Sequence, residues 1–240
     1  MRTQVILKAI ALLALPTVMF LASCDPNAIK GNGDVLTETR NVQDFNGIDV
    51  SVSGDVHVTQ GQTFKVIVRA EENLLPYLET EVQNGSLHIY FSHNVRDVDD
   101  LEVEITMPEL KKVQVSSSSH LHTHGTFNGN TLNLGMSGSG EIKLSDIDFQ
   151  YINADVSGSG NIQLIGIGKE LDANVSGSGT IDALQCPVET AEAHVSGSGT
   201  IKLKVSDALV AYVSGSGHVR YEGSPDVEKH ISGSGSVTKL

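Results

Sequence analysis

The chain repeats one tetrapeptide, Ser-Gly-Ser-Gly, six times at nearly equal spacing. The first serines of the copies are Ser137, Ser157, Ser176, Ser196, Ser214 and Ser232, which lie 20, 19, 20, 18 and 18 residues apart. A period of this length is typical of a solenoid, because each coil can bury its apolar face only against the next coil. The repeat therefore constrains the fold much more than the function.

Apolar and polar residues alternate around each tetrapeptide. Residues 154–164 read Ala-Asp-Val-Ser-Gly-Ser-Gly-Asn-Ile-Gln-Leu, and the later copies keep this frame. Alternation with a period of two is expected of a strand with one buried face. We therefore expect the Ala, Val, Ile and Leu columns to form the core of an all-β solenoid with 18 to 20 residues per coil. The glycines should point inward, where a Cβ would crowd the bend, and the serines outward.

The same frame occurs twice upstream, at Val50–Val58 and Val115–Thr123, so we expect the solenoid to begin near residue 45. Between these copies, three runs read as strands: Phe64–Arg69, Leu87–Phe91 and Leu101–Met107. Asn84-Gly85 predicts a hairpin turn, and Glu71–Leu78 a short helix interrupted at Pro76. We predict one β-helix domain over residues 34–240, in which residues 34–114 are irregular and form a cap, and residues 115–240 form the regular coils.

The first 24 residues have the pattern of a lipoprotein leader. Arg2 and Lys8 precede the short apolar run Ala9–Phe20, and Leu21-Ala22-Ser23-Cys24 matches a lipobox. The apolar run is shorter than the ~20 residues that span a membrane. We expect a signal peptide over residues 1–23, a diacylated Cys24, and a tether over residues 24–33. The bland alternative is an ordinary secretory signal.

Several segments of the sequence resemble those of a known bacterial family. Phe45–Val50, Phe64–Val68, Glu72–Leu75, Asn84–Ile89 and the Ser-Gly-Ser-Gly coils are similar to the bacterial family of the auto-transporter adhesin, head GIN domain. The resemblance covers about residues 40 to 240. It implies a right-handed parallel β-helix on the envelope of Bacteroidetes-type bacteria, and it supplies no catalytic residues.

The net charge limits the classes of binding partner that we expect, and the cysteine content limits the disulfide bonds. The chain has 16 basic and 29 acidic residues. Two of the basic residues, Arg2 and Lys8, lie in the expected leader, so the mature chain has 14 basic and 29 acidic residues and a formal net charge of −15. This balance excludes nucleic acid and anionic lipid surfaces as expected partners, because both bind clustered Lys and Arg. With Cys24 lipidated, Cys186 has no disulfide partner, and we expect it at a corner of a coil. We expect no cofactor.

A first candidate site is the segment His120-Leu121-His122-Thr123-His124. In a strand, the three imidazoles lie on one outward face and Leu121 and Thr123 point inward, so the histidines could share a zinc ion with an open fourth position. The simpler interpretation is a solvated strand face, because the equivalent columns of the other coils are polar. The acidic run Arg96–Glu104 reads as a solvated edge, since it lacks a calcium-binding pattern.

A second candidate is the hydroxyl ladder formed by Ser157, Ser159, Ser176, Ser178, Ser196 and Ser198. One interpretation is structural, with hydroxyls bonded between coils at a tight corner. The other is a flat recognition surface for an ordered partner such as a polysaccharide. No histidine recurs at a fixed offset from the serines, so nucleophilic activation is not indicated.

Two classes of function remain. The first is a non-enzymatic envelope lipoprotein, anchored at Cys24 and expected at the outer membrane, which presents a flat flank to a glycan or protein as an adhesin does. The alternative is a polysaccharide-active lyase or hydrolase, but the repeats leave no room for the long loops that build a catalytic groove. The last coil ends without a helix or proline. We expect either a monomer, with Lys239 as a charged guard of the open edge, or a weak end-to-end homo-oligomer.

Overall fold

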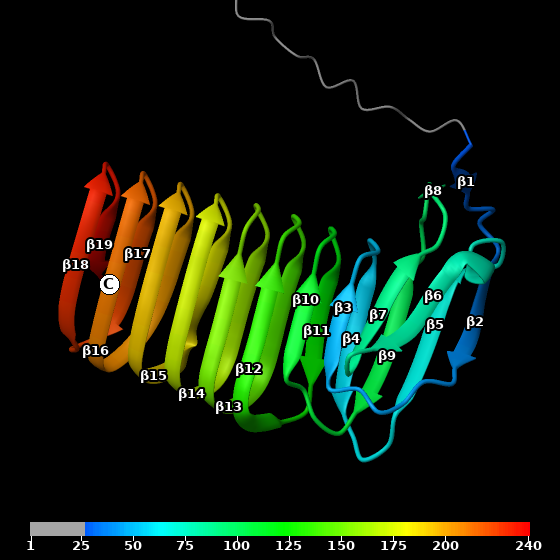
Figure 1. The fold of residues 1–240 in the computed structure, drawn as a ribbon, viewed down its shortest axis with the longest axis horizontal. Coiled ribbons are helices and arrows are strands. Elements are labelled where there is room, and N and C mark those ends of the chain that lie inside the picture. The colour runs from blue at the N-terminus through cyan, green and yellow to red at the C-terminus, as the bar shows by residue number, and fades with distance from the viewer. Residues whose placement is uncertain (1–26) are drawn as a thin grey trace, which may run out of the picture.

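Each Ser-Gly-Ser-Gly tetrapeptide turns the chain at the same edge of a stack of coils (Figure 1). The computed structural model describes residues 27–240, and the expected signal peptide and Cys24 lie outside the described residues. The coils stack in parallel with about 20 residues each, and this confirms the predicted parallel β-helix. Among the described residues, no helix is long and apolar enough to cross a membrane.

The middle of the regular coils is built from long strands that bend midway: β13 (Glu141–Val156), β14 (Asn161–Gly177), β15 (Thr180–Gly197) and β16 (Thr200–Gly215). Shorter strands stack on both sides of them: β12 (Phe127–Met136), β17 (His218–Gly223), β18 (Asp226–Gly233) and β19 (Ser236–Lys239). The register shifts at the bends, for example between Ala183 and Val188, so that one chain segment serves two facing sheets. The buried, free Cys186 lies at this bend, as expected, and burial raises the pKa of its thiol to about 12.

The predicted core columns are confirmed. Ile162 pairs in register with Ile181, and both are buried, as are Ala154 and Ala173 in the facing sheet. Stacking identical or similar residues in successive coils packs the narrow interior with buried apolar side chains, and this burial stabilises a chain with few aromatic residues.

The glycines point inward at the turn because there is no space for a side chain. A Cβ on Gly179 would lie 2.4 Å from the carbonyl oxygen of Gly160 and 2.5 Å from Cγ1 of Val156. The turn is held by the main chain, since the amides of Ser178 and Gly179 both donate to the carbonyl of Gly158 at 3.1 Å. The serine side chains therefore take no part in closing the turn.

The strands that precede β12 form the front coils, and these coils stack in an order that differs from their order in the sequence. Strands β3 (Gly47–Val50) and β4 (Asp55–Gln60) pair on one side with β10 (Lys112–Val115) and β11 (His120–His124). On the other side they pair with β7 (Ser86–Phe91) and β9 (Glu102–Met107). The two upstream copies of the repeat frame are therefore direct neighbours, and the segment between them builds a coil on the opposite side.

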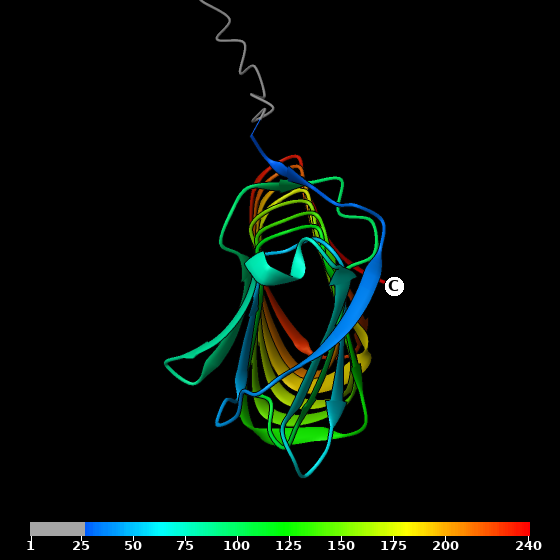
Figure 2. The same ribbon diagram turned by 90° about the vertical axis from the view of Figure 1, so that its right-hand side faces the viewer.

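That outer coil is covered by the predicted cap (Figure 2). Strand β2 (Val35–Arg40) runs antiparallel to β5 (Lys65–Glu71), which is antiparallel to β9, and β6 (Leu78–Gln83) forms a hairpin with β7. Asn84 and Gly85 make the expected turn, with φ of 51° and 74°. A short sheet of β1 (Ile29–Lys30) and β8 (Val95–Arg96) lies beside the cap.

The expected helix at Glu71–Leu78 is wrong in its bounds. Glu71 ends strand β5, and only Leu75–Tyr77 form a helix, the 3₁₀ turn η1. Pro76 lies inside this first turn, where its missing amide costs nothing, rather than interrupting a longer helix. Leu74, Leu75 and Leu78 are buried, so the turn closes the N-terminal end of the core.

The C-terminal end is closed by a different lysine from the one expected. Lys229 of β18 occupies the inward column that holds Ala211 in the coil before it. Its Nζ donates to the carbonyl of Val237 at 3.0 Å and lies 5.7 Å from the ring centre of Tyr221. Lys239 instead donates to the hydroxyl of Ser224 on the surface. The side chain that crosses the open end of the core is therefore that of Lys229.

Candidate functional site

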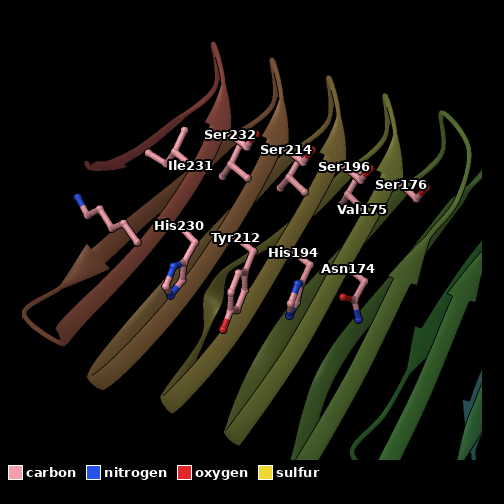
Figure 3. A pocket seen from close by; sticks show the side chains of 13 residues that line it. Asn174, Val175, Ser176, His194, Ser196, Tyr212, Ser214, His230, Ile231 and Ser232 are labelled. Atoms are coloured by element: carbon pink, nitrogen blue, oxygen red, sulfur yellow. The ribbon is translucent and has the colours of Figure 1, made fainter.

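A row of large polar side chains runs across the C-terminal coils on the outer face of one sheet (Figure 3). Asn174 of β14 pairs in register with His194 of β15, which pairs with Tyr212 of β16, and Tyr212 pairs with His230 of β18. Each of these residues lies two positions before the first serine of a tetrapeptide. Parallel, in-register stacking thus converts one position of the repeat into a continuous row, which we call the aromatic row.

The three rings of the aromatic row stack face to face. The centroids of His194 and Tyr212 are 4.5 Å apart with planes at 8°, and those of Tyr212 and His230 are 4.7 Å apart at 10°. These distances match the spacing of neighbouring strands, so the stack follows from the fold and needs no distortion. The rings present their edges to solvent, and Tyr212 keeps 37% of its surface exposed.

Carboxylates hold both histidines of the aromatic row. Nε2 of His194 lies 2.8 Å from Oε1 of Glu192, and Nε2 of His230 lies 2.8 Å from Oε1 of Glu228. Each glutamate is two residues before its histidine, so both side chains extend from the same face of one strand. In the coil before that of His194, Asn174 donates from Nδ2 to Oδ1 of Asp172 at 2.8 Å. The aromatic row is therefore bordered by acidic groups.

A row of serines forms the other border. Ser176, Ser196, Ser214 and Ser232 lie beside the aromatic row, and the two rows enclose a groove with a volume of about 690 Å³. Figure 3 shows the serines along one side of the groove and the stacked rings along the other. At the C-terminal end, the groove is completed by Lys229 and Ile231. We call this site the C-terminal groove.

The predicted hydroxyl ladder is divided by the structure. Ser176 and Ser196 line the C-terminal groove, whereas Ser157 lines a separate hollow of about 160 Å³ beside Asp155. Ser159, Ser178 and Ser198 are exposed and lie one step further round the turn. The hydroxyls of Ser117 and Ser119, in the equivalent turn of the front coils, both donate to the carbonyl of Val52 in the neighbouring coil. Both interpretations of the six-serine ladder stay predictions. The hydroxyls of these six serines remain accessible to a partner.

The three histidines of β11 lie far from the groove, in the front coils. As predicted, Leu121 and Thr123 are buried and the imidazoles point outward. The structure adds His57 of β4, whose ring centroid is 6.2 Å from that of His122 and 5.8 Å from that of His124. His120 instead approaches Asp55, with Nδ1 and Oδ1 3.6 Å apart.

Burial lowers the pKa of His122 below its usual value of 6.5. The nearby Glu141 opposes this effect, while His57, Lys143 and His120 add to it. In the described part of the chain, no three His, Cys, Asp or Glu side chains are placed to hold a metal ion. The zinc site at His120, His122 and His124 stays a prediction.

The aromatic row was not identified from the sequence. The signal was present, because the position before Val-Ser-Gly or Ile-Ser-Gly holds Asn174, His194, Tyr212 and His230 in successive copies. Aromatic residues make up only 5% of the chain, so the composition gives no sign of an aromatic surface. Only the in-register stack shows that these few rings are neighbours.

The sequence from residue 44 to residue 225 matches the family described as "Putative auto-transporter adhesin, head GIN domain". The chain belongs to this family. The family is labelled as an adhesin, so an adhesin-like role at the cell surface or envelope is the coarse assignment that membership supports. No curated protein matches the chain.

Solved structures share the fold of this chain. A protein described as a putative adhesin from Bacteroides fragilis superposes with a TM-score of 0.83 at 21% identity, covering 89% of this chain and 100% of that one. A protein from Parabacteroides distasonis, described as a putative lipid binding protein, superposes at 0.75 with 28% identity over 89% and 99% of the two chains. A putative adhesin from the same species superposes at 0.71 with 25% identity over 89% and 100%.

Proposed function

We propose that this protein is a non-enzymatic, lipid-anchored adhesin of the cell envelope that binds a glycan or protein through the C-terminal groove. The observation that carries the proposal is the groove itself: an ordered stack of exposed rings beside a row of accessible hydroxyls. Rings that are already stacked lose little conformational freedom on binding, so the surface is pre-organised.

The position of the groove also fits a role at a surface. The tether enters at the capped N-terminal end, whereas the groove lies on the last coils at the opposite end (Figure 1). A chain anchored through Cys24 would therefore hold the groove away from the membrane. The lipobox and the membership of an adhesin family support an envelope lipoprotein, and we propose the outer membrane as the site of its anchor.

The test is a glycan and matrix-protein array probed with the purified, processed protein. We expect Tyr212→Ala to lose binding to whichever spots the wild type retains. The matched control is Tyr151→Ala, because Tyr151 is also an exposed tyrosine, at 45%, but lies on β13 outside the groove. Equal loss in both variants, or binding that neither affects, would contradict the assignment of the groove.

The proposed absence of enzymatic activity is tested by an assay for cleavage of the bound polysaccharide. Any polysaccharide that the array identifies is incubated with the protein, and its chain length and reducing ends are followed over time. We expect no change relative to a blank. Release of shortened or unsaturated products that Glu192→Gln or Glu228→Gln abolishes would instead establish the lyase or hydrolase alternative.

The lipid anchor is tested in a bacterial host with a fatty-acid analogue. We expect the label to enter the wild-type protein and to be absent from Cys24→Ala, because the lipobox modifies only the cysteine at its end. Cys186→Ala is the control, since this cysteine is buried and should not affect labelling. Unchanged incorporation in Cys24→Ala would refute the anchor.

A further inference from the structure

The C-terminal groove runs along the axis of the solenoid and across its strands. Its two borders advance together, because Asn174, His194, Tyr212 and His230 pair in register and so do Ser176, Ser196, Ser214 and Ser232. Each step is one coil, about 4.8 Å, and the three steps give the groove a length of roughly 14 Å. A ligand in this groove meets the same kinds of groups once per coil.

This repeat distance distinguishes between extended polymers. A peptide strand advances by only about 3.3 Å per residue, so its groups fall out of step with the coils after one or two residues. A six-membered sugar ring linked through opposite carbons advances by close to one coil. Each sugar unit can therefore lie opposite one serine and one member of the aromatic row. Because successive units of a β-1,4-linked chain turn over, they present alternate edges to these two rows.

The charges around the groove favour a neutral sugar. Glu192, Glu228 and Asp172 border the aromatic row, and carboxylates accept hydrogen bonds from sugar hydroxyls but repel carboxylate or sulfate groups. Lys229 is the one Lys or Arg that lines the groove in the described chain, and its Nζ already donates to the carbonyl of Val237. The formal charge of the whole chain, −13, opposes a polyanion further.

The apolar parts of the site fit a sugar chain as well. The ring edges of the stack supply apolar surface next to the polar borders. Ile231, in the inward column of Val213, adds apolar surface at the C-terminal end of the groove, where 47% of it is exposed. Carbohydrates need both, because their rings carry C–H groups between their hydroxyls. The stacked imidazole and phenol edges provide this mixed surface along the groove.

From these observations we infer that the C-terminal groove binds a neutral, extended polysaccharide, with its chain parallel to the solenoid axis and about one sugar unit per coil. This inference rests on the proposed function and specifies the class of its ligand. It assigns Tyr212, at the centre of the row, as the main contact, and Ser196 and Ser214 as the hydroxyl partners beside it.

The test is calorimetric titration of the processed protein with neutral β-1,4-linked glucose oligomers of two to six units. We expect binding to strengthen with each unit up to three or four, the number that the groove accommodates, and then to level off. Tyr212→Ala should weaken binding of the hexamer roughly tenfold, while Tyr151→Ala leaves it unchanged. Ser214→Ala, which removes the hydroxyl at an exposed position, should weaken it several-fold.

A polyuronate of equal length is titrated in parallel and should bind more weakly than the neutral hexamer. Affinity that does not depend on length, stronger binding of the polyuronate, or equal effects of Tyr212→Ala and Tyr151→Ala would overturn the inference. If the array instead yields a protein partner whose binding requires Tyr212, the proposed function stands and only the polysaccharide is excluded. If no ligand on the array or in the titrations needs Tyr212 for binding, both the proposed function and the polysaccharide inference are wrong.

Discussion

At the scale of single residues, the turn between the two sheets depends on glycine for steric reasons. Gly179 has the carbonyl of Gly160 and the methyl group of Val156 at the place where a Cβ would lie. Neither neighbour can move freely, because one is main chain and the other is packed in the core. The adjacent Ser178 is exposed and contributes only its amide to the turn.

We therefore expect Gly179→Ala to lower the free energy of unfolding by roughly 2 to 3 kcal/mol, and Ser178→Ala to change it by less than about 0.5 kcal/mol. Urea titration followed by circular dichroism measures both values. Similar losses in the two variants would mean that the inward and outward positions of the tetrapeptide are assigned wrongly.

His122 makes the stability of the front coils depend on pH. Its pKa is lowered in the folded chain, so the unfolded chain binds a proton more readily, and stability falls as the pH drops below about 6.5. The charged and titratable groups around it are Glu141, His57, Lys143 and His120.

Replacing His122 by Asn removes this proton-linked loss. We expect the melting temperature of wild type to fall more between pH 7.5 and pH 5.5 than that of His122→Asn. His93→Asn serves as a control, because His93 is an exposed histidine outside this cluster. An equal fall in wild type and His122→Asn would show that protonation of His122 is not coupled to folding.

At the scale of the elements, the regular coils follow directly from the sequence, whereas the order of the front coils does not. Two copies of the frame, at Val50–Val58 and Val115–Thr123, are visible as strands, and they prove to be direct neighbours. Periodicity gives the inward face of each strand but not which strand lies beside it. The coil formed by β7 and β9 is added outside β3 and β4, and only the tertiary pairing reveals this.

The two ends of the solenoid are protected in different ways. The N-terminal end is covered by β2, β5, β6 and η1, whereas at the C-terminal end of the described chain the side chain of Lys229 crosses from β18 to β19. Open strand edges pair with other chains unless a charge or a cover prevents it, and an inward-pointing lysine is one such device.

We predict that Lys229→Ala lowers the free energy of unfolding by about 1 kcal/mol, from the lost hydrogen bond to Val237, and increases end-to-end association. Lys239→Ala, which loses only a surface contact with Ser224, should behave as wild type. Thermal melts and light scattering at rising concentration measure the two effects. If Lys239→Ala lowered stability or increased association more than Lys229→Ala, Lys239 would be the lysine that protects the open edge, as the sequence predicted.

At the scale of the whole molecule, the fold places the N-terminal cap and the C-terminal groove at opposite ends of the stack of coils (Figure 1). The sequence identified the serine column but not its partner row, because a row forms only when equal positions of several coils are brought into register. The histidines of β11 were conspicuous in the sequence since they are close together along the chain. The groove residues are separated by 18 to 20 positions and become neighbours only in space.

The most direct test of this account is to block the groove at one serine. Ser214→Cys introduces a thiol in the groove. Ser137→Cys introduces one at the equivalent position of an earlier repeat, outside the groove. Cys186 is buried and its thiol pKa is about 12, so a maleimide carrying a bulky polymer should react with the introduced cysteine and leave Cys186 unmodified. Binding of the array ligand is then measured before and after labelling. The account predicts that labelling abolishes binding in Ser214→Cys and leaves it intact in Ser137→Cys, whereas equal binding by the two labelled variants would contradict it.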